Sequence, residues 1–155
     1  MVAYAGGTSK YIPLKPEGKS KTANDWTLDM DHLQSLVTDK TKMIFFNNPN
    51  NPLGKVFSVE ECQGAIQNFQ NFCYFFYLAL ADFCIKNDIV CISDEVYEHL
   101  VYKPLEHIRI ANLPGMYERT ITIGSAGKTW SATGWKIGWS MGPPTLIKAM
   151  QVCRS

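Results

Sequence analysis

The sequence lacks an excess of charge of either sign. Its 155 residues include 15 Lys and Arg against 14 Asp and Glu, which gives a formal net charge of +1. Proteins that bind nucleic acid or an anionic membrane by charge usually carry a strongly basic surface. We therefore expect neither nucleic acid nor a membrane among the partners of this protein.

The sequence also lacks a CxxC pair, a secretory signal and a long apolar run. Its five cysteines are odd in number, so a reducing compartment fits better than a secreted disulfide framework. No charged segment followed by an apolar stretch opens the chain. The most apolar run, 72–81, is about half as long as the ~20 residues that span a membrane. We expect a cytoplasmic protein, with mitochondria as the alternative.

Apolar residues make up 46% of the sequence, enough for the core of one domain or part of one. Three short, continuous apolar runs are typical of buried strands: 43–46, 89–92 and 120–123. A capping box from Ser58 to Glu61 predicts a helix that extends to about Asn87, between the first two runs. We therefore predict an α/β fold with a mainly parallel sheet and flanking helices.

The sequence also predicts two helices and one loop in addition to the strands of the sheet. Residues 31–38 carry apolar side chains at helical spacing, which predicts a short amphipathic helix. Residues 15–21 are polar and rich in turn formers, which predicts a loop. Two prolines before residue 145 predict the start of a final helix over 145–154.

Polar residues follow each of the three predicted strands. Asn51, Asp94 and Lys128 each come shortly after one of the apolar runs. Because ligands of open α/β sheets bind at the carboxyl ends of the strands, we expect these three side chains to lie near one another. This edge of the sheet is the candidate site.

Lys128 stands among small residues, and this setting has three interpretations. An amine there could be a Schiff-base nucleophile, because burial lowers the pKa of a lysine. It could instead be a solvated loop lysine, which is the usual state of that residue type. Residues 127–129 also repeat the end of a phosphate-binding Walker A motif, but Thr122 stands where that motif requires a glycine.

The other candidate residues also have ordinary alternatives. Asp94 after an apolar strand requires a cation or hydrogen-bond donors if it is buried, whereas alone it could cap a helix or lie on the surface. Tyr97 could contribute packing alone. Asn51 could simply form a turn, and Lys136 could be a surface lysine.

Three separated segments, in order, resemble the signature segments of class I, fold-type I pyridoxal-phosphate aminotransferases. These segments are 47–55 (NNPNNPLGK), 93–98 (SDEVYE) and 124–139, which contains GSAGKT and GWKIGW. Residues 114–120 (PGMYERT) resemble the kynurenine aminotransferase and cysteine-conjugate beta-lyase branch. Apart from one insertion, the resemblance covers nearly the whole chain.

The resemblance implies a role for each candidate residue. Lys128 would form the internal aldimine with pyridoxal 5'-phosphate and then move the alpha proton as a general base. Asp94 would pair with the pyridinium nitrogen. Asn51 and Tyr97 would bind the phenolic oxygen, and Asn51 would also reach the substrate carboxylate. The phosphate would be held by two further residues, Ser125 and Lys136; no metal is implied.

The resemblance also implies what the whole protein does. It would transfer an amino group from an aromatic or sulfur-containing amino acid to a 2-oxo acid, with cysteine-S-conjugate beta-lyase activity as a side reaction, and it would form a homodimer. Family members are several hundred residues long, so residues 1–155 resemble part of the large, cofactor-binding domain, without its N-terminal part and without the small domain. The alternatives are an inactive fragment of such an enzyme and a P-loop nucleotide-binding domain.

The stretch around 62–80 departs from the family pattern, because it is longer and dense in aromatic residues. In a surface helix these aromatic side chains would be exposed and would favour aggregation. Our hypothesis is a sequence fault, such as an intron translated in frame. Comparison of the spliced transcript with the genomic sequence tests it.

Overall fold

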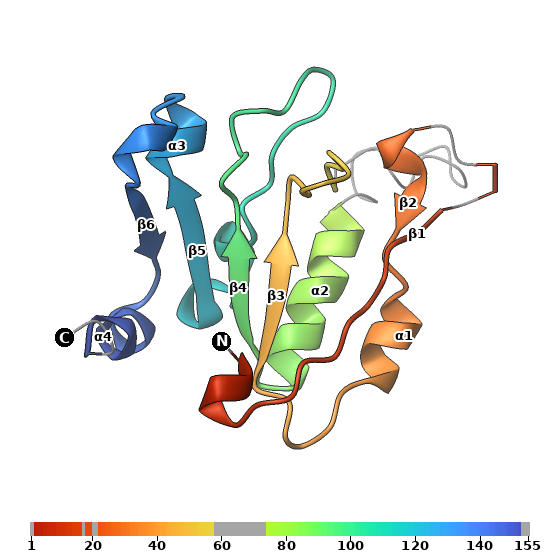
Figure 1. Ribbon diagram of the computed structural model, residues 1–155. Coiled ribbons are helices and arrows are strands. Elements are labelled where there is room, and N and C mark those ends of the chain that lie inside the picture. Colours follow the sequence, from red (N-terminus) through yellow and green to blue (C-terminus); the bar gives the residue numbers. More distant parts are fainter. Residues whose placement is uncertain (1, 17, 20–21, 58–73, 153–155) are drawn as a thin grey trace. The chain divides into compact units, whose positions relative to one another are not determined.

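The computed structural model describes residues 2–16, 18–19, 22–57 and 74–152 (Figure 1). The chain divides into two compact units, Met1–Thr41 and Lys42–Ser155. The candidate residues all belong to the second unit, so the first is described only briefly.

The first unit contains a small antiparallel pair and one short helix. Strand β1 (Lys15–Pro16) pairs with β2 (Trp26–Thr27), and 3-10 turns η1 (Val2–Ala5) and η2 (Ala23–Asp25) accompany them. The prediction of a loop over 15–21 is therefore wrong at its start, because two residues there are ordered by cross-strand hydrogen bonds. Helix α1 (Met30–Ser35) confirms the predicted amphipathic helix, with fewer residues.

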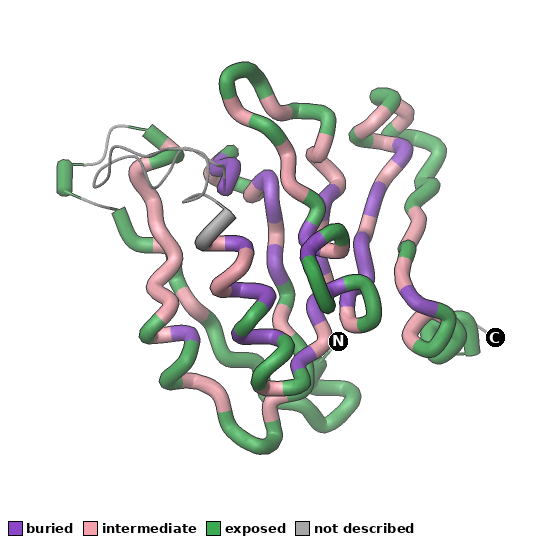
Figure 2. Tube along the Cα trace, turned by 180° about the vertical axis from the view of Figure 1, so that it is seen from behind, coloured by how far each residue is buried: buried purple, intermediate pink, exposed green. Residues whose placement is uncertain are grey.

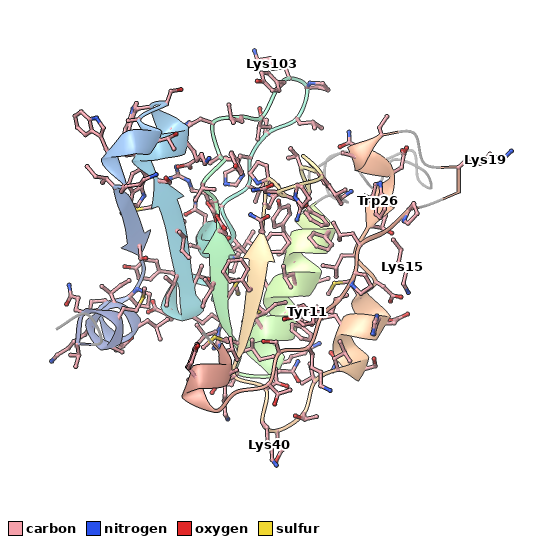
Figure 3. All side chains as sticks on the ribbon, in the orientation of Figure 1. Tyr11, Lys15, Lys19, Trp26, Lys40 and Lys103 are labelled. Carbon is pink, nitrogen blue, oxygen red and sulfur yellow. The ribbon has the colours of Figure 1, made fainter. Side chains whose placement is uncertain are left out.

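Helix α1 begins where Asp29 caps it. The Asp29 carboxylate accepts a hydrogen bond of 2.8 Å from the backbone N–H of His32 and one of 3.1 Å from Lys15 Nζ. Lys15, labelled in Figure 3, extends from β1 to make this contact. The cap satisfies one of the free N–H groups at the helix start and joins the strand pair to the helix.

The second unit contains a four-stranded sheet in the order β3-β4-β5-β6. The strands are β3 (Met43–Asn47), β4 (Val90–Asp94), β5 (Thr120–Ser125) and β6 (Gly138–Met141). The first three run parallel and confirm the predicted strands, and β6 is antiparallel to β5. Strand β6 was not predicted, because an edge strand with exposed ends has no continuous apolar run.

Helix α2 (Tyr74–Lys86) connects β3 to β4 and forms much of the core. Tyr77, Leu80, Ala81 and Cys84 on this helix are buried, and Figure 2 shows buried segments alternating with less buried ones along α2. The described part confirms the predicted helix, and its predicted start at residue 59 lies outside the described residues. Tyr77 is buried, so this member of the aromatic stretch around 62–80 does not have the exposure that a surface helix would give it; residues 62–73 of that stretch lie outside the described residues.

Short helices complete the second unit. They are η4 (Ile110–Asn112), η5 (Tyr117–Arg119), α3 (Ala126–Thr129), η6 (Thr133–Trp135) and α4 (Pro144–Val152). Helix α4 confirms the predicted final helix, with a proline at its first position, although residues 153–155 lie outside the described ones. Within the described ranges, no helix combines the length and the apolar character that a membrane span needs.

Candidate active site

The carboxyl ends of three parallel strands lie side by side in the second unit (Figure 1). Asn47 at the end of β3 pairs in register with Asp94 at the end of β4, and Asp94 pairs with Ile123 on β5. The Asp94 carbonyl accepts a hydrogen bond of 3.1 Å from the Asn48 N–H. The segments that carry Asn51, Asp94 and Lys128 therefore leave the sheet at the carboxyl ends of neighbouring strands, as the sequence predicts.

Asn51 lies in a tight loop after β3. Its backbone N–H donates to Asn47 Oδ1 at 2.8 Å, while its side chain is exposed. The loop closes on itself through two backbone hydrogen bonds, from Asn50 N–H to the Lys55 carbonyl at 2.7 Å and from Gly54 N–H to the Asn50 carbonyl at 2.8 Å. The turn interpretation is thus correct for the backbone, and it leaves the Asn51 amide available to a ligand.

Asp94 and Tyr97 flank the turn after β4, and both are half-buried. Asp94 Oδ1 accepts a hydrogen bond of 3.3 Å from the Val96 N–H, which is a local turn contact and not the helix cap considered from the sequence, because residues 96–99 form a turn. The ring of Tyr97 lies 5.6 Å from Lys128 Nζ, within the range of a cation–π contact. The structure therefore brings Tyr97 and Lys128 together across two neighbouring strand ends.

Ser125 and Lys128 belong to the junction of β5 and α3. Ser125 is the last residue of the strand and the N-cap position of the four-residue helix α3. The side chain of Lys128 is exposed among the residues that the structure describes, so the burial that the Schiff-base argument from the sequence assumed is not present there. The start of α3 is tied to the segment before β6, because the Ala126 N–H donates to the Ile137 carbonyl at 3.1 Å.

The small residues beside Lys128 serve the packing of the protein itself. A Cβ on Gly124 would lie 2.3 Å from the indole nitrogen of Trp139, and a Cβ on Gly127 would lie 3.1 Å from the Cα of Thr133. Glycine at these two positions lets β6 and η6 approach the strand end that holds Lys128. Neither glycine therefore requires a bound phosphate to explain it.

Lys136 follows η6, which packs against α3. It is exposed and has a left-handed backbone with φ of 55°. A non-glycine residue in this conformation is uncommon and fixes the direction of the chain between η6 and β6. Lys136 thus caps the end of η6, which packs against the helix that carries Lys128, and its side chain is exposed to solvent.

A buried polar cluster behind the strand end was missed by sequence reasoning. Glu95 is 2% exposed and accepts a hydrogen bond of 2.9 Å from Ser93 Oγ. His107 Nε2 lies 2.9 Å from the second carboxylate oxygen of Glu95, and Arg109 Nε lies 4.0 Å from the same oxygen. The loop between these residues turns back at its exposed tip, where Figure 3 labels Lys103. A carboxylate directly after Asp94 was the one available signal.

The cluster has the chemistry of a closed ion-pair network. Ligand atoms of Glu95, Glu98 and His107 lie within 4.8 Å of one another, a spacing that suits a metal. However, Arg109 donates to the Glu98 carboxylate through Nε at 2.9 Å and also through a terminal nitrogen. A guanidinium therefore already supplies positive charge, and the absence of a metal remains a prediction.

The comparisons with known proteins agree on one family. The profile described as "Aminotransferase class I and II" matches residues 1–155. Kynurenine–oxoglutarate transaminase 3 of Homo sapiens is 53% identical over 154 residues, covering 97% of this chain and 31% of the relative. Kynurenine–oxoglutarate transaminase 1 of Rattus norvegicus is 47% identical over 155 residues, covering 97% and 33%. The chain thus spans about a third of the length of these curated relatives.

Solved structures give the same result. The N-succinyldiaminopimelate aminotransferase of Mycobacterium tuberculosis superposes with a TM-score of 0.77 at 40% identity, covering 95% of this chain and 33% of that one. The aromatic aminotransferase of Pyrococcus horikoshii gives a TM-score of 0.66 at 38% identity, covering 80% and 29%. The α/β sheet described above is the fold of these enzymes. The chain belongs to the class I and II aminotransferase family.

Proposed function

We propose that the protein to which this chain belongs is a pyridoxal-phosphate-dependent transaminase. It moves an amino group from an aromatic or sulfur-containing amino acid to a 2-oxo acid, with cysteine-S-conjugate beta-lyase activity as a side reaction. The observation that supports this most is that the segments carrying Asn51, Asp94 and Lys128 follow the carboxyl ends of three neighbouring strands, with the Tyr97 ring 5.6 Å from Lys128 Nζ. The names of the curated relatives add kynurenine and oxoglutarate as the first substrates to test.

The donor set fits the cofactor chemically. The cofactor aldehyde needs an amine, which Lys128 supplies, and the ring nitrogen needs a carboxylate, which Asp94 supplies. The phenolic oxygen needs neutral donors, which are present in Tyr97 and Asn51. The phosphate needs a cation and a hydroxyl, which are present in Lys136 and Ser125. When bound, pyridoxal phosphate supplies the electron-accepting ring that amino acid chemistry requires.

The chain's own residues then have distinct tasks. Lys128 would hold the cofactor and later move the alpha proton with the same amine. Asp94 would keep a proton on the ring nitrogen, because a carboxylate stabilises a neighbouring cation and a neutral group does so less well. Tyr97 lies against the lysine amine, so its ring would limit the directions in which that amine moves. Asn51 would orient the substrate carboxylate.

The alternative is that residues 1–155 alone form an inactive part of the large domain. Lys128, Asn51 and Lys136 are all exposed. On strand β3 at the sheet edge, Met43 is 55% exposed and Phe45 is 62% exposed. Exposed apolar side chains on an edge strand indicate a surface that further chain or a second subunit covers. We therefore propose that activity, and homodimer formation in the cytoplasm, belong to the full-length protein.

Covalent trapping tests this proposal. The protein is incubated with pyridoxal phosphate and reduced with borohydride, which fixes the cofactor on the lysine that holds it, and peptide mass spectrometry locates the label. We expect selective labelling of Lys128, with Lys136 as the internal control. Scattered labelling of a folded, full-length protein would refute the cofactor assignment. Labelling of the full-length protein but not of residues 1–155 alone would favour the inactive-part alternative for the isolated chain.

A further inference from the structure

A closed ring of hydrogen bonds joins the two ends of the loop that carries Asn51. Asn48 Nδ2 donates to the Tyr77 hydroxyl at 2.7 Å, and that hydroxyl donates to the Phe57 carbonyl at 2.5 Å. The Phe57 N–H donates in turn to Asn48 Oδ1 at 2.9 Å. Asn48 is the first residue after β3, and Phe57 lies nine residues further along the chain, so the ring closes the 48–57 loop at its base.

The Tyr77 hydroxyl is a fixed, neutral donor. Tyr77 is fully buried on α2, and its ring lies edge-on to Phe46 with centroids 6.3 Å apart. Burial raises the pKa of the Tyr77 phenol far above its usual value, and the charge of Glu95 raises it further. The hydroxyl therefore keeps its proton over the whole working range of pH and always donates to the Phe57 carbonyl.

The loop passes this constraint to Asn51. Inside the ring, Asn50 bonds Lys55 and Gly54 across the loop, and the Asn51 N–H bonds Asn47 Oδ1. These bonds leave few backbone torsions free between the ring and Asn51. A change in the separation of Asn48 and Phe57 would therefore move the Asn51 side chain at the loop tip.

We propose that Tyr77 is a positioning residue that holds the 48–57 loop and so places the Asn51 amide at the candidate site. This inference rests on the proposed function for the role of Asn51, while the closure of the loop stands on the hydrogen bonds alone. It also gives Tyr77, inside the aromatic stretch around 62–80, a structural task in this protein.

The first test measures amide hydrogen exchange in the full-length, cofactor-free protein. Tyr77→Phe keeps the ring and removes both hydrogen bonds of the hydroxyl. Loss of two buried hydrogen bonds corresponds to roughly tenfold or more in a local opening equilibrium. We expect the Asn50, Asn51 and Gly54 amides to exchange about tenfold faster, with residues 80–86 of α2 unchanged.

Two variants make this test specific. Tyr102→Phe removes a hydroxyl from a side chain that is 76% exposed and should leave the loop amides unchanged. Asn48→Asp removes the donor to Tyr77 while it keeps the acceptor for the Phe57 N–H, so it should accelerate the same amides without altering the tyrosine. Equal acceleration of the loop and of α2, or no acceleration in either Tyr77→Phe or Asn48→Asp, would overturn the proposal.

The second test asks whether Tyr77 acts through Asn51. The visible absorbance of bound pyridoxal phosphate is titrated with pH in Tyr77→Phe, in Asn51→Ala and in the double variant. We expect both single variants to shift the midpoint in the same direction, and the double variant to match Asn51→Ala. Additive shifts would show that the two residues act independently and would overturn the positioning role.

The two proposals fail in different ways. A wild-type protein that binds no cofactor at Lys128 refutes the transaminase assignment, and hydrogen exchange still decides whether Tyr77 holds the loop. A protein that binds the cofactor normally, with loop exchange unaffected by Tyr77→Phe, refutes the role of Tyr77 and leaves the transaminase assignment standing.

Discussion

Replacement of Glu95 should destabilise the second unit more than replacement of any exposed acid near it. Its carboxylate is 2% exposed and bonds Ser93 and His107 at 2.9 Å each. The other ring nitrogen of His107 is buried without a hydrogen-bond partner among the described residues. Glu95→Ala would thus leave a buried imidazole with neither nitrogen satisfied, as well as an unpaired hydroxyl.

The magnitude follows from these contacts. Leaving a buried polar group without its hydrogen-bond partner typically costs about 1–3 kcal/mol, and Glu95→Ala does so at both Ser93 and His107, so we expect a cost of about 2–6 kcal/mol. Arg109 adds little to this, because it is half-exposed and remains bonded to Glu98. Glu95→Gln keeps an acceptor oxygen and the side-chain volume, so we expect it to cost about 1–2 kcal/mol.

Urea unfolding of both variants tests the reasoning, with Glu106→Ala as the matched control because Glu106 lies exposed in the same loop. The free energy of unfolding is compared at equal m-value. An Ala variant as stable as the control would show that the cluster contributes nothing. A Gln variant as unstable as the Ala variant would show that net charge, and not hydrogen bonding, holds the cluster together.

Three further predictions follow from the structure. Gly124→Ala should destabilise the protein by about 1–3 kcal/mol in thermal unfolding, because the added methyl meets the facing indole, while Gly134→Ala adds its methyl to open space and should be neutral. The pKa of Asp29 is lowered from 3.8, chiefly by a backbone hydrogen bond, so its contribution to helix α1 is present above that pH and is lost as the pH falls through the lower folded value. An NMR titration of the Asp29 carboxyl checks this, and a midpoint at or above 3.8 would contradict it. In the full-length protein, Lys128→Ala should abolish transamination while still allowing loose cofactor binding, whereas Asp94→Ala should weaken both; ordinary turnover by the lysine variant would overturn its role.

The sequence by itself determined the architecture around the candidate site. Continuous apolar runs are a local property of the chain, so β3, β4 and β5 could be located without the structure. The motifs that contain Asn51, Asp94 and Lys128 also indicated the family, which the comparisons confirm. Parallel strands place their carboxyl ends together by geometry, which is why these three positions could be expected at one edge.

Features that depend on residues far apart in the chain were decided only by the tertiary structure. Strand β6 forms by antiparallel pairing with β5, and its own four residues show no apolar pattern that predicts a strand. Whether Glu95 is buried depends on a loop that returns His107 to it twelve positions later. The sequence did not show whether Tyr77 is buried; it lies in the core, where Asn48 and Phe57 provide hydrogen-bond partners for its hydroxyl. Local patterns specify which element forms, whereas a buried polar contact forms only when distant segments fold together to satisfy it.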